Sequence, residues 1–222
     1  DACDILEKAD NFEEAVHDLI KEQASAHQRI VFNGNGYSDE WIEEAERRGL
    51  PNIKNMVDAV PALTTEKAIA LFEKFNVFSE AELMSRGEIL YENYPKALNI
   101  EARTMIDMAG KQIIPAVIKY TTSLANSINA VKAACDADIS TQTDLLTEVA
   151  ILLTEAKNAL AKLSEATVKG GAIEEGRAQA IFFRDQVKTA MDELRAPIDK
   201  LEMIVDKEMW PMPSYGDLIF EV

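Results

Sequence analysis

The sequence predicts an all-α protein, in which small helices precede an antiparallel bundle of three long helices with heptad repeats. Three observations indicate this fold class. The chain of 222 residues contains only nine glycines and seven prolines, and its hydrophobic fraction of 47% is ample for a core. Helix-capping residues recur through the first half of the chain. The second half repeats apolar residues at alternating spacings of three and four, which is typical of packed helices.

The first predicted helix begins after Asn11, a residue type that caps helix N-termini. The positions with i, i+3, i+4 spacing, which mark its inward face, are Phe12, Ala15, Val16, Leu19, Ile20 and Gln23. The pattern changes at residues 29–33 to a short run with β-branched side chains. This run predicts a brief strand or extended segment.

A turn and a short helix are predicted next. Residues 33–36, Asn-Gly-Asn-Gly, tolerate positive φ and predict a tight turn with left-handed geometry. Ser38 is a suitable N-cap for the following helix, which has two acidic residues in its first turn. Gly49 ends this helix, and Pro51 prevents it from resuming.

Residues 50–64 contain two prolines and predict a loop. Residues 65–75 predict a short helix, whose inward side chains are expected to be Leu71, Phe72 and Phe75. Ser79 and Glu82 have the spacing of a capping box, which starts another helix. This helix is expected to end at about Tyr94, because the proline that follows disfavours helical geometry in the residue before it.

Three segments with heptad spacing predict the bundle. They cover residues 114–135, 145–166 and 187–205. Residues 136–140 and residues 169–172, which include two consecutive glycines, are expected to connect them. Because these connections are short, consecutive helices are expected to run in opposite directions.

Prolines mark two of these helices and the end of the chain. Pro115 and Pro197 lie inside the first and third bundle helices, where we expect kinks rather than ends. The closing sequence MWPMPSYGDLIFEV, residues 209–222, cannot be helical through Trp210–Pro213. It is predicted to be an extended apolar tail that lies on a surface of this chain or of a partner.

Net charge and cysteine content narrow the class of protein. A formal net charge of -16 argues against nucleic acid and anionic lipid as partners, because like charges repel. The two cysteines, Cys3 and Cys135, form no CxxC motif, which favours a reducing compartment. No apolar run approaches the ~20 residues of a membrane span, and no secretory signal opens the chain. We expect a cytoplasmic protein, and the acidic start without an initiator methionine indicates a fragment.

The stretch IVFNGNGYSDEW, residues 30–41, is the candidate phosphate-binding loop. A P-loop requires a lysine after its glycines, and none follows Gly36 in this stretch. A dinucleotide-binding fingerprint requires a third glycine, and Asp39 occupies that position. With Glu40, it places two carboxylates at the helix N-terminus where a phosphate would bind. A simple turn around Gly34 and Gly36 is therefore the favoured interpretation.

The supply of histidine limits metal and acid–base chemistry. The spacing Glu14-x-x-His17 matches half of a di-metal site of helical bundles, but the sequence lacks the second half. A single metal held by His17 with Glu13 or Glu14 stays open, although a surface histidine is the favoured interpretation. No GxSxG motif occurs, and neither cysteine has a neighbouring histidine. The residues therefore predict no catalytic, cofactor-binding or metal-binding residue in this chain.

Three long stretches combine unusual residues, including Trp41, the NGNGY turn and the WPMPSYGD tail. They read HQRIVFNGNGYSDEWIEEAERRGLPNIKNMVDAVPAL (27–63), FSEAELMSRGEILYENYPKALNIEARTMIDMAGKQIIPAVIKY (78–120) and MWPMPSYGDLIF (209–220). These stretches resemble the C-terminal region of type III glutamine synthetase, the large-subunit bacterial class. Residues 125–205 resemble it only in helical character. Gly87 departs from the pattern, since we expect a larger residue inside a helix.

The resemblance implies that the parent protein is an ATP-dependent ligase, which joins ammonia to glutamate through a γ-glutamyl phosphate with magnesium or manganese. It also implies a cytoplasmic homo-oligomer of stacked hexameric rings, in which this chain contacts the rest of its subunit and neighbouring subunits. The family's ATP-binding, metal-binding and substrate-binding positions lie in an earlier β-rich portion, and none maps onto this chain. Residues 1–27 are then the end of the catalytic domain, and residues 28–222 are the C-terminal helical domain.

The preferred hypothesis is thus a C-terminal helical domain that is inactive alone and serves packing and oligomer assembly. The alternative is an independent helical adaptor that binds a partner helix along an open face. An exposed apolar groove would favour the adaptor, whereas complete burial of the heptad residues would count against it. A third hypothesis, regulatory ligand or metal binding between helices, depends on Glu14 and His17 alone.

Overall fold

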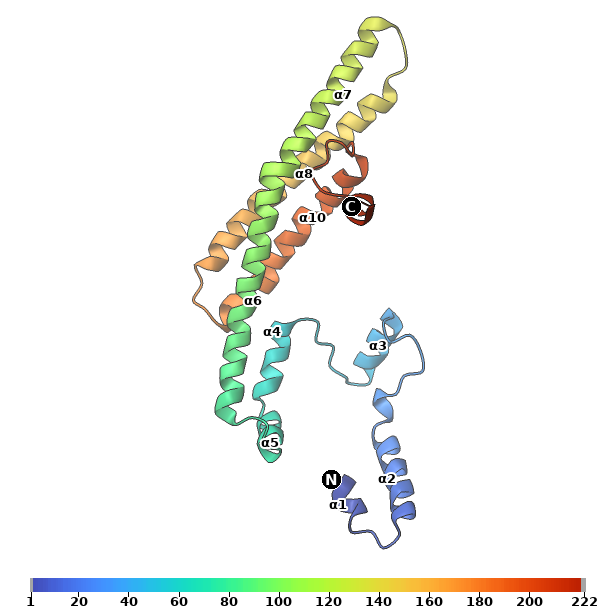
Figure 1. Ribbon diagram of the computed structural model, residues 1–222, viewed down its shortest axis with the longest axis vertical. Helices are drawn as coiled ribbons and strands as arrows, with labels where there is room; N and C mark the ends of the chain where they lie inside the picture. Colours follow the sequence, from blue (N-terminus) through green and yellow to red (C-terminus); the bar gives the residue numbers. More distant parts are fainter. Residues whose placement is uncertain (1, 221–222) are drawn as a thin grey trace. The chain divides into compact units, whose positions relative to one another are not determined.

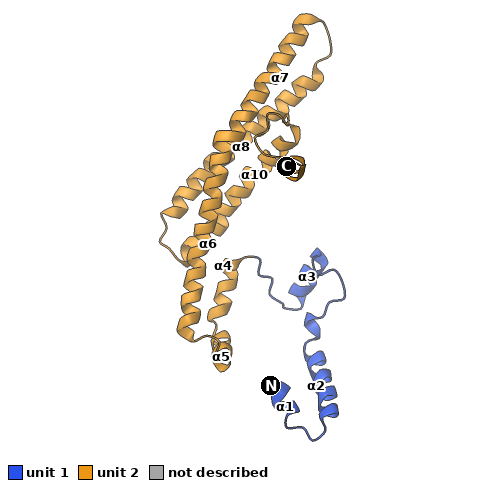
Figure 2. Cartoon of the chain, in the orientation of Figure 1, with its two compact units in different colours: residues 1–54 blue, residues 55–222 orange. Residues whose placement is uncertain are grey.

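A computed structural model describes residues 2–220 of the chain, and this range contains helices but no strand. The prediction of an all-α fold is confirmed. Contacts divide the chain into two compact units, unit 1 with residues 1–54 and unit 2 with residues 55–222 (Figure 2). The boundary predicted after residue 27 concerns the origin of each segment in a longer protein, and it stays a prediction.

Unit 1 consists of short helices joined by irregular segments (Figure 1). Its helices are α1 (Ala2–Leu6), α2 (Phe12–Ala26), the 3-10 turn η1 (Gln28–Ile30) and α3 (Asp39–Arg47). As predicted, α2 begins after Asn11, whose side-chain oxygen accepts the backbone N–H of Glu14 at 3.4 Å.

The brief strand predicted at residues 29–33 is only partly right. The chain forms η1 through Ile30 and becomes extended at Val31, with φ -86° and ψ 117°. A strand needs a neighbouring strand for its backbone hydrogen bonds. Here a side chain serves instead, because Arg48 Nη1 donates to the carbonyl oxygens of Arg29 at 3.2 Å and Val31 at 2.8 Å.

Helix α3 ends as its sequence predicts. Gly49 has φ +72°, and its N–H donates to the carbonyl of Glu46 at 2.9 Å. The N–H of Leu50 donates to the carbonyl of Ala45 at 2.9 Å, which completes a Schellman motif. Ser38 precedes the helix in an extended conformation, but its hydroxyl donates to a backbone carbonyl of the preceding turn rather than capping the helix.

Unit 2 begins with helical turns where a loop was predicted, namely α4 (Met56–Ala59) and the 3-10 helix η2 (Val60–Thr64). The short helix predicted at residues 65–75 is present as α5 (Glu66–Lys74). Asn55 caps α4 by accepting the N–H of Asp58 at 3.0 Å, and Pro61 stands at the start of η2, where its missing N–H costs nothing. Burial of Val57 and Val60, each 2% exposed, anchors this segment.

The inward face predicted for α5 is largely wrong. Leu71 and Phe75 are 53% and 62% exposed, whereas Phe72 is half-buried and lies 5.6 Å from the ring of Phe78. Residues 71 and 75 share a face by their i, i+4 spacing. That face of α5 is largely exposed, with Lys74 Nζ lying over the Phe75 ring at 5.4 Å.

The next helix does not end at Tyr94. Helix α6 (Glu80–Met108) begins with the predicted capping box and passes through Pro95, which is buried. A proline inside a helix costs about 3 kcal/mol or more. The buried α6 residues on either side of it, Leu83, Leu98 and Ala102, explain why the helix persists, since ending it would uncover them.

Gly87 lies on the buried side of α6. A Cβ at this position would come within 3.5 Å of Val60 Cγ1 and 3.7 Å of Thr64 Cγ2, so η2 packs directly on the helix backbone. The larger residue expected here would displace that contact. Close packing of two helical segments therefore limits the size of the residue at position 87, although the Cβ of an alanine would make ordinary contacts there.

Helix α6 continues without a break through the π-helical segment η3 (Ala109–Ile113) into α7 (Ile114–Ala134). Pro115 stands at the start of α7, directly after this wider turn. A π-turn changes the hydrogen-bond register of the backbone, and such turns accommodate a residue that cannot donate. The first long element of unit 2 is thus one rod from Glu80 to Ala134 (Figure 1).

The other two long elements pack along this rod. They are α8 (Ser140–Gly171) and the run of α9 (Arg177–Phe182), the π-helical segment η4 (Phe183–Val187) and α10 (Lys188–Ile204). Figure 1 shows α8 returning along α7, and α10 returning along α8. The glycines at 170 and 171 lie within α8, so the second connection is 172–176 rather than 169–172.

Two buried clusters fill the space between these helices. One gathers residues of α6, α8, η4 and α10 around the most buried side chains Leu163, Phe183 and Leu194. The other joins α7, α8 and the end of α10 around Val117, Val149 and Leu201. Pro197 is buried within α10, as Pro95 is within α6.

The predicted tail is extended only in part. Residues 210–214 are not helical, but they lead into a short helix, α11 (Tyr215–Phe220). Ser214 and Asp217 form its cap, since Asp217 Oδ2 accepts the N–H of Ser214 at 2.7 Å. Trp210 packs against the second cluster and so fixes the tail to unit 2, which agrees with a tail laid on a surface.

Candidate functional site

The NGNG turn of unit 1 is the first candidate for a site. Among the described residues positive φ occurs at Asn76, Gly49 and Gly176, so the predicted left-handed geometry of this turn is wrong. Its shape comes instead from Asn35, whose side-chain oxygen accepts the N–H of Tyr37 at 3.1 Å. The hydroxyl of Ser38 donates to the carbonyl of the same asparagine at 2.8 Å.

The two glycines of this turn have different roles. A Cβ at Gly34 would lie 2.7 Å from ring carbons of Phe32, whereas a Cβ at Gly36 would meet nothing within 4 Å. The Phe32 ring is stacked on Trp41 with 4.5 Å between ring centroids. Gly34 therefore leaves room for the Phe32 ring in its stack on Trp41.

Charges around this turn are already paired. The side chains of Arg47 and Arg48 both donate to Glu44, at 2.6–2.7 Å and 2.5 Å respectively. These hydrogen bonds, first from Arg47 and then from Arg48, lower the pKa of Glu44 to about 2. Arg48 also lies over the Trp41 ring at 5.6 Å. The cations therefore hold α3 together and do not face an open phosphate site.

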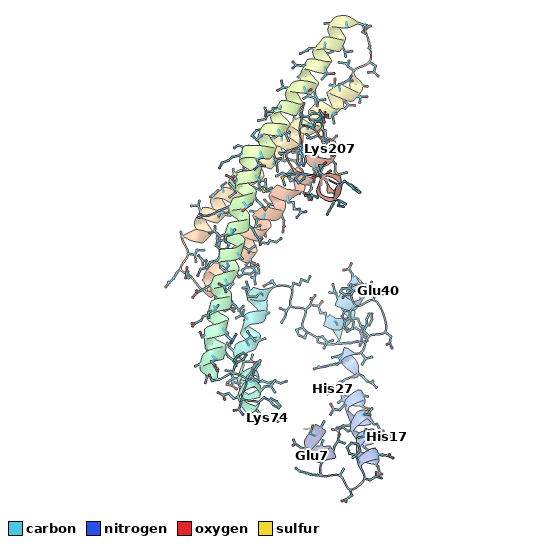
Figure 3. The ribbon with its side chains drawn as sticks, viewed as in Figure 1. Glu7, His17, His27, Glu40, Lys74 and Lys207 are labelled. Atoms are coloured by element: carbon cyan, nitrogen blue, oxygen red, sulfur yellow. The ribbon has the colours of Figure 1, made fainter. Side chains whose placement is uncertain are left out.

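The candidate metal ligands of α2 lie on an exposed face. His17 has a side chain that is 79% exposed, and its Nδ1 lies 3.6 Å from Asp18 Oδ1 (Figure 3). Glu14 accepts a hydrogen bond from the side chain of Asn11 at 3.2 Å. Within residues 2–220 no three His, Cys, Asp or Glu side chains gather where they could hold a metal ion.

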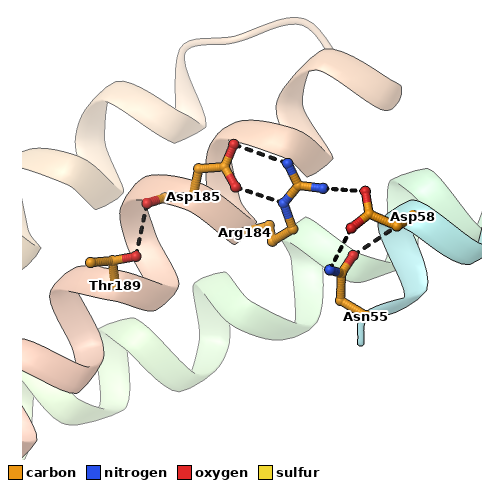
Figure 4. A network of polar contacts seen from close by, with 5 residues as sticks. All are labelled: Asn55, Asp58, Arg184, Asp185 and Thr189. Atoms are coloured by element: carbon orange, nitrogen blue, oxygen red, sulfur yellow. Dashed lines mark hydrogen bonds and ion pairs between the residues drawn. The ribbon is translucent and has the colours of Figure 1, made fainter. Parts of the chain in front are cut away.

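A polar network in unit 2 joins segments far apart in the sequence (Figure 4). Arg184 Nη1 donates to Asp58 Oδ1 at 2.5 Å, and the rest of its guanidinium group binds Asp185 through two hydrogen bonds of 2.6 and 3.0 Å. Asn55 Nδ2 donates to the other oxygen of Asp58 at 2.7 Å. Asp185 raises the pKa of Arg184, so this guanidinium stays charged. The network fastens the start of unit 2 to η4.

This network was missed from the sequence. The pattern Asn55-x-x-Asp58 is a readable helix cap, but it gives no indication of a cation 126 residues further along. The network is an ion-pair contact between helices in which both carboxylates are bound by Arg184, and the hydroxyl of Thr189 donates to the backbone carbonyl of Asp185 at 2.9 Å. None of the residues drawn in Figure 4 is a histidine that could activate a nucleophile. It is consequently a structural element rather than a reaction centre.

The family model of the glutamine synthetase C-terminal domain matches residues 15–132, which is more than half of the chain. The chain belongs to this family. The matched range includes most of α2, the NGNG turn, α3, the short helices at the start of unit 2 and the rod almost to its end. The domain therefore includes parts of both units.

Curated relatives agree with this assignment. The chain is 36% identical to the glutamine synthetase of Butyrivibrio fibrisolvens over 96% of its own length and 31% of the relative. It is 34% identical to the type-3 glutamine synthetase of Dictyostelium discoideum and 29% identical to the glutamine synthetase of Bacteroides fragilis. The alignments extend across residues 125–205, beyond the resemblance seen in the sequence.

The chain spans about 30% of the length of these relatives. The matched family is that of a C-terminal domain, and about two thirds of each relative lies outside the aligned region. None of the described helices is long and apolar enough to cross a membrane.

Proposed function

We propose that this domain is the noncatalytic C-terminal part of a glutamine synthetase subunit. The complete enzyme would join ammonia to glutamate with ATP, through a γ-glutamyl phosphate, in the cytoplasm. One observation carries the proposal: the chain matches the C-terminal domain of the family and spans only about 30% of its relatives. The residues that run the reaction would then lie in the remaining part of the subunit.

The side chains of this domain fit neither ATP nor Mg²⁺ or Mn²⁺. These metal ions require several carboxylate or other oxygen ligands at one point, and the described residues do not bring three acidic or histidine side chains together. The two arginines near the NGNG turn are paired with Glu44. Two acidic residues occupy the first turn of α3, where a phosphate would otherwise bind. No step of the reaction is therefore assigned to residues of this domain.

The role that remains is packing and assembly. Unit 2 has two clusters of buried apolar side chains, which give it a stable core at about 25 cal/mol per Å² of buried apolar area. Exposed apolar side chains remain outside this core, among them Ile100, Ile151 and Phe220. In a homo-oligomer of stacked hexameric rings, such side chains would contact neighbouring subunits or the rest of the same subunit.

Two measurements test this proposal. Glutamate-dependent ADP release should be absent from the isolated 222-residue chain and present in the full-length subunit. Removal of unit 2 from the full-length subunit should reduce the mass of its oligomer in analytical ultracentrifugation. Turnover by the isolated chain, or an unchanged oligomer without unit 2, would overturn the proposal.

A second candidate function is an independent helical adaptor, and one observation favours it. The outer side of α8 carries a shallow groove with a mainly apolar lining of Leu146, Thr147, Ala150, Ile151, Thr154 and Glu155. Ile151 is 54% exposed there. A partner helix could lie along such a face.

The size of the natural polypeptide separates the two functions. An antibody against this domain should detect a protein about three times longer than 222 residues if the domain belongs to a synthetase subunit. A separate protein of 24.6 kDa in cells would instead support the adaptor.

A further inference from the structure

Helix α2 of unit 1 has an apolar face without sufficient cover. None of its residues is buried, and Phe12 and Ile20 are 60% and 62% exposed. Val16 and Leu19, which complete the same stripe, are only half-buried. The opposite side carries polar groups, so the helix is amphipathic in its sequence but unpaired along its apolar side.

The neighbouring part of unit 1 cannot supply this cover. Helix α1 packs on α2, but it is five residues long, and its own Ile5 is 49% exposed. In all of unit 1 the described residues include one buried apolar side chain, Ala45. Unit 1 thus has no core on which α2 could rest.

A helix of this length needs tertiary contacts. Isolated helices shorter than roughly 12–15 residues are marginal in water, and most helical stability in proteins comes from packing of the apolar face. Helix α2 has 15 residues and favourable caps, which specify where it begins but do not stabilise it alone. The apolar stripe of α2 therefore lacks the packing that stabilises a helix of this length.

We propose that this face docks into an apolar groove edged by Lys or Arg, on the part of the synthetase subunit outside these 222 residues. The inference rests on the proposed function. About two thirds of the length of the relatives lies beyond the matched region, and this additional sequence could contain the partner surface. The charges on α2 indicate the chemistry of the partner surface. Glu13 and Glu22 flank the apolar stripe on its two sides and are both exposed, so a basic rim would complement them.

Hydrogen exchange of the α2 amides tests this docking. The exchange is measured in the isolated chain and in the full-length subunit. Docking should leave α2 exchanging rapidly in the isolated chain and should slow its exchange about 100-fold or more in the full-length subunit. Rapid exchange in both proteins would overturn the proposal.

Two matched variants identify the face. Ile20→Asp puts one negative charge on the apolar stripe, whereas Ser25→Asp puts one on the polar side of the same helix. In the full-length subunit Ile20→Asp should restore rapid exchange and Ser25→Asp should not. Glu22→Lys should weaken the protection by several-fold if the rim is basic. Protection that survives Ile20→Asp would assign the contact to another face.

The other possible covers give different results. Protection of α2 in the isolated chain at all concentrations would show that unit 2 covers it, and protection only at high concentration would show a second copy. Either result overturns this docking while leaving the proposed function intact. Failure of the proposed function would appear separately, as ADP release by the isolated chain.

Discussion

The two units of this domain have the same kinds of helix-capping motifs, yet only one of them has a hydrophobic core. Unit 1 has a well-formed N-cap at Asn11 and a Schellman motif at Gly49, but Ala45 is its single buried apolar residue among those described. Unit 2 buries large side chains such as Phe183 and Leu194 completely. Capping specifies where a helix begins and ends, whereas burial between long helices supplies stability.

The largest expected effect contrasts a core side chain with an exposed one. Phe183→Ala should lower the free energy of unfolding of the isolated chain by about 3–5 kcal/mol, because it empties the centre of the first cluster. Phe12→Ala in unit 1 should change it by less than about 0.5 kcal/mol. Urea denaturation followed by circular dichroism measures both. Equal effects would show that unit 1 has a core of its own.

Two adjacent glycines near the end of α8 sharpen the comparison within unit 2. A Cβ at Gly170 would lie 2.7 Å from Phe183 Cε2, whereas a Cβ at Gly171 would meet nothing within 4 Å. Gly170→Ala should destabilise the chain by about 1–3 kcal/mol through overpacking. Gly171→Ala should be neutral or stabilise it by up to about 1 kcal/mol, because alanine favours the helix. Thermal unfolding of the two variants makes the comparison, and similar melting temperatures would contradict it.

The network around Arg184 should have a moderate effect on stability. Arg184→Met removes the ion pair with Asp58, and because that carboxylate is half exposed the cost should be about 1 kcal/mol. Arg195→Met is the control, since its pair with Asp199 is an exposed i, i+4 contact worth about 0.3–0.5 kcal/mol.

Hydrogen exchange should also locate the change. Arg184→Met should accelerate exchange in α4 and η2, which the network fastens to η4, and Arg195→Met should not. Uniform acceleration across unit 2 would indicate a general loss of stability instead.

A smaller, local effect is expected at the NGNG turn. Gly34→Ala should displace the Phe32 ring and loosen its stack on Trp41, whereas Gly36→Ala should leave the stack unchanged. In a Trp210→Phe background, Trp41 fluorescence reports this contact alone. The free energy of unfolding of unit 2, measured with urea, should change by less than about 0.5 kcal/mol in either variant. A fluorescence shift in Gly36→Ala would contradict the assignment.

The smallest expected effect is the pH dependence of α3. Glu44 has a folded pKa of about 2, below its ordinary value of 4.5, so its ion pairs contribute fully above about pH 4.5 and are lost as pH falls towards 2. A carbon-13 NMR titration of this carboxyl group gives the pKa directly. Arg47→Gln should raise it, and a midpoint near 4.5 in the unchanged chain would show that the pairs do not form in solution.

Local chemistry made much of this fold predictable. The caps at Asn11, Gly49 and the Ser79–Glu82 box are where the sequence places them, and the three rods with heptad spacing are helices. Each of these features depends on residues within one or two turns of each other. A sequence displays such relationships directly.

Features that depend on distant residues could not be predicted in the same way. Local rules predict a helix end at Pro95, but contacts of the surrounding buried residues keep the helix intact. Residues 50–64 contain prolines typical of a loop, yet Val57 and Val60 become buried and the segment is helical. The partner of Asp58 lies 126 residues away. In each case tertiary packing overrides a local preference.

The unbroken helix from Glu80 to Ala134 has a mechanical consequence. At 1.5 Å per residue it is a lever about 80 Å long, with η2 seated against Gly87 near its foot. A tilt of about 5° at the foot would sweep the far end through about 7 Å. Small changes at the contact between η2 and Gly87 are thereby amplified, at the far end of the helix, into displacements larger than the width of a side chain.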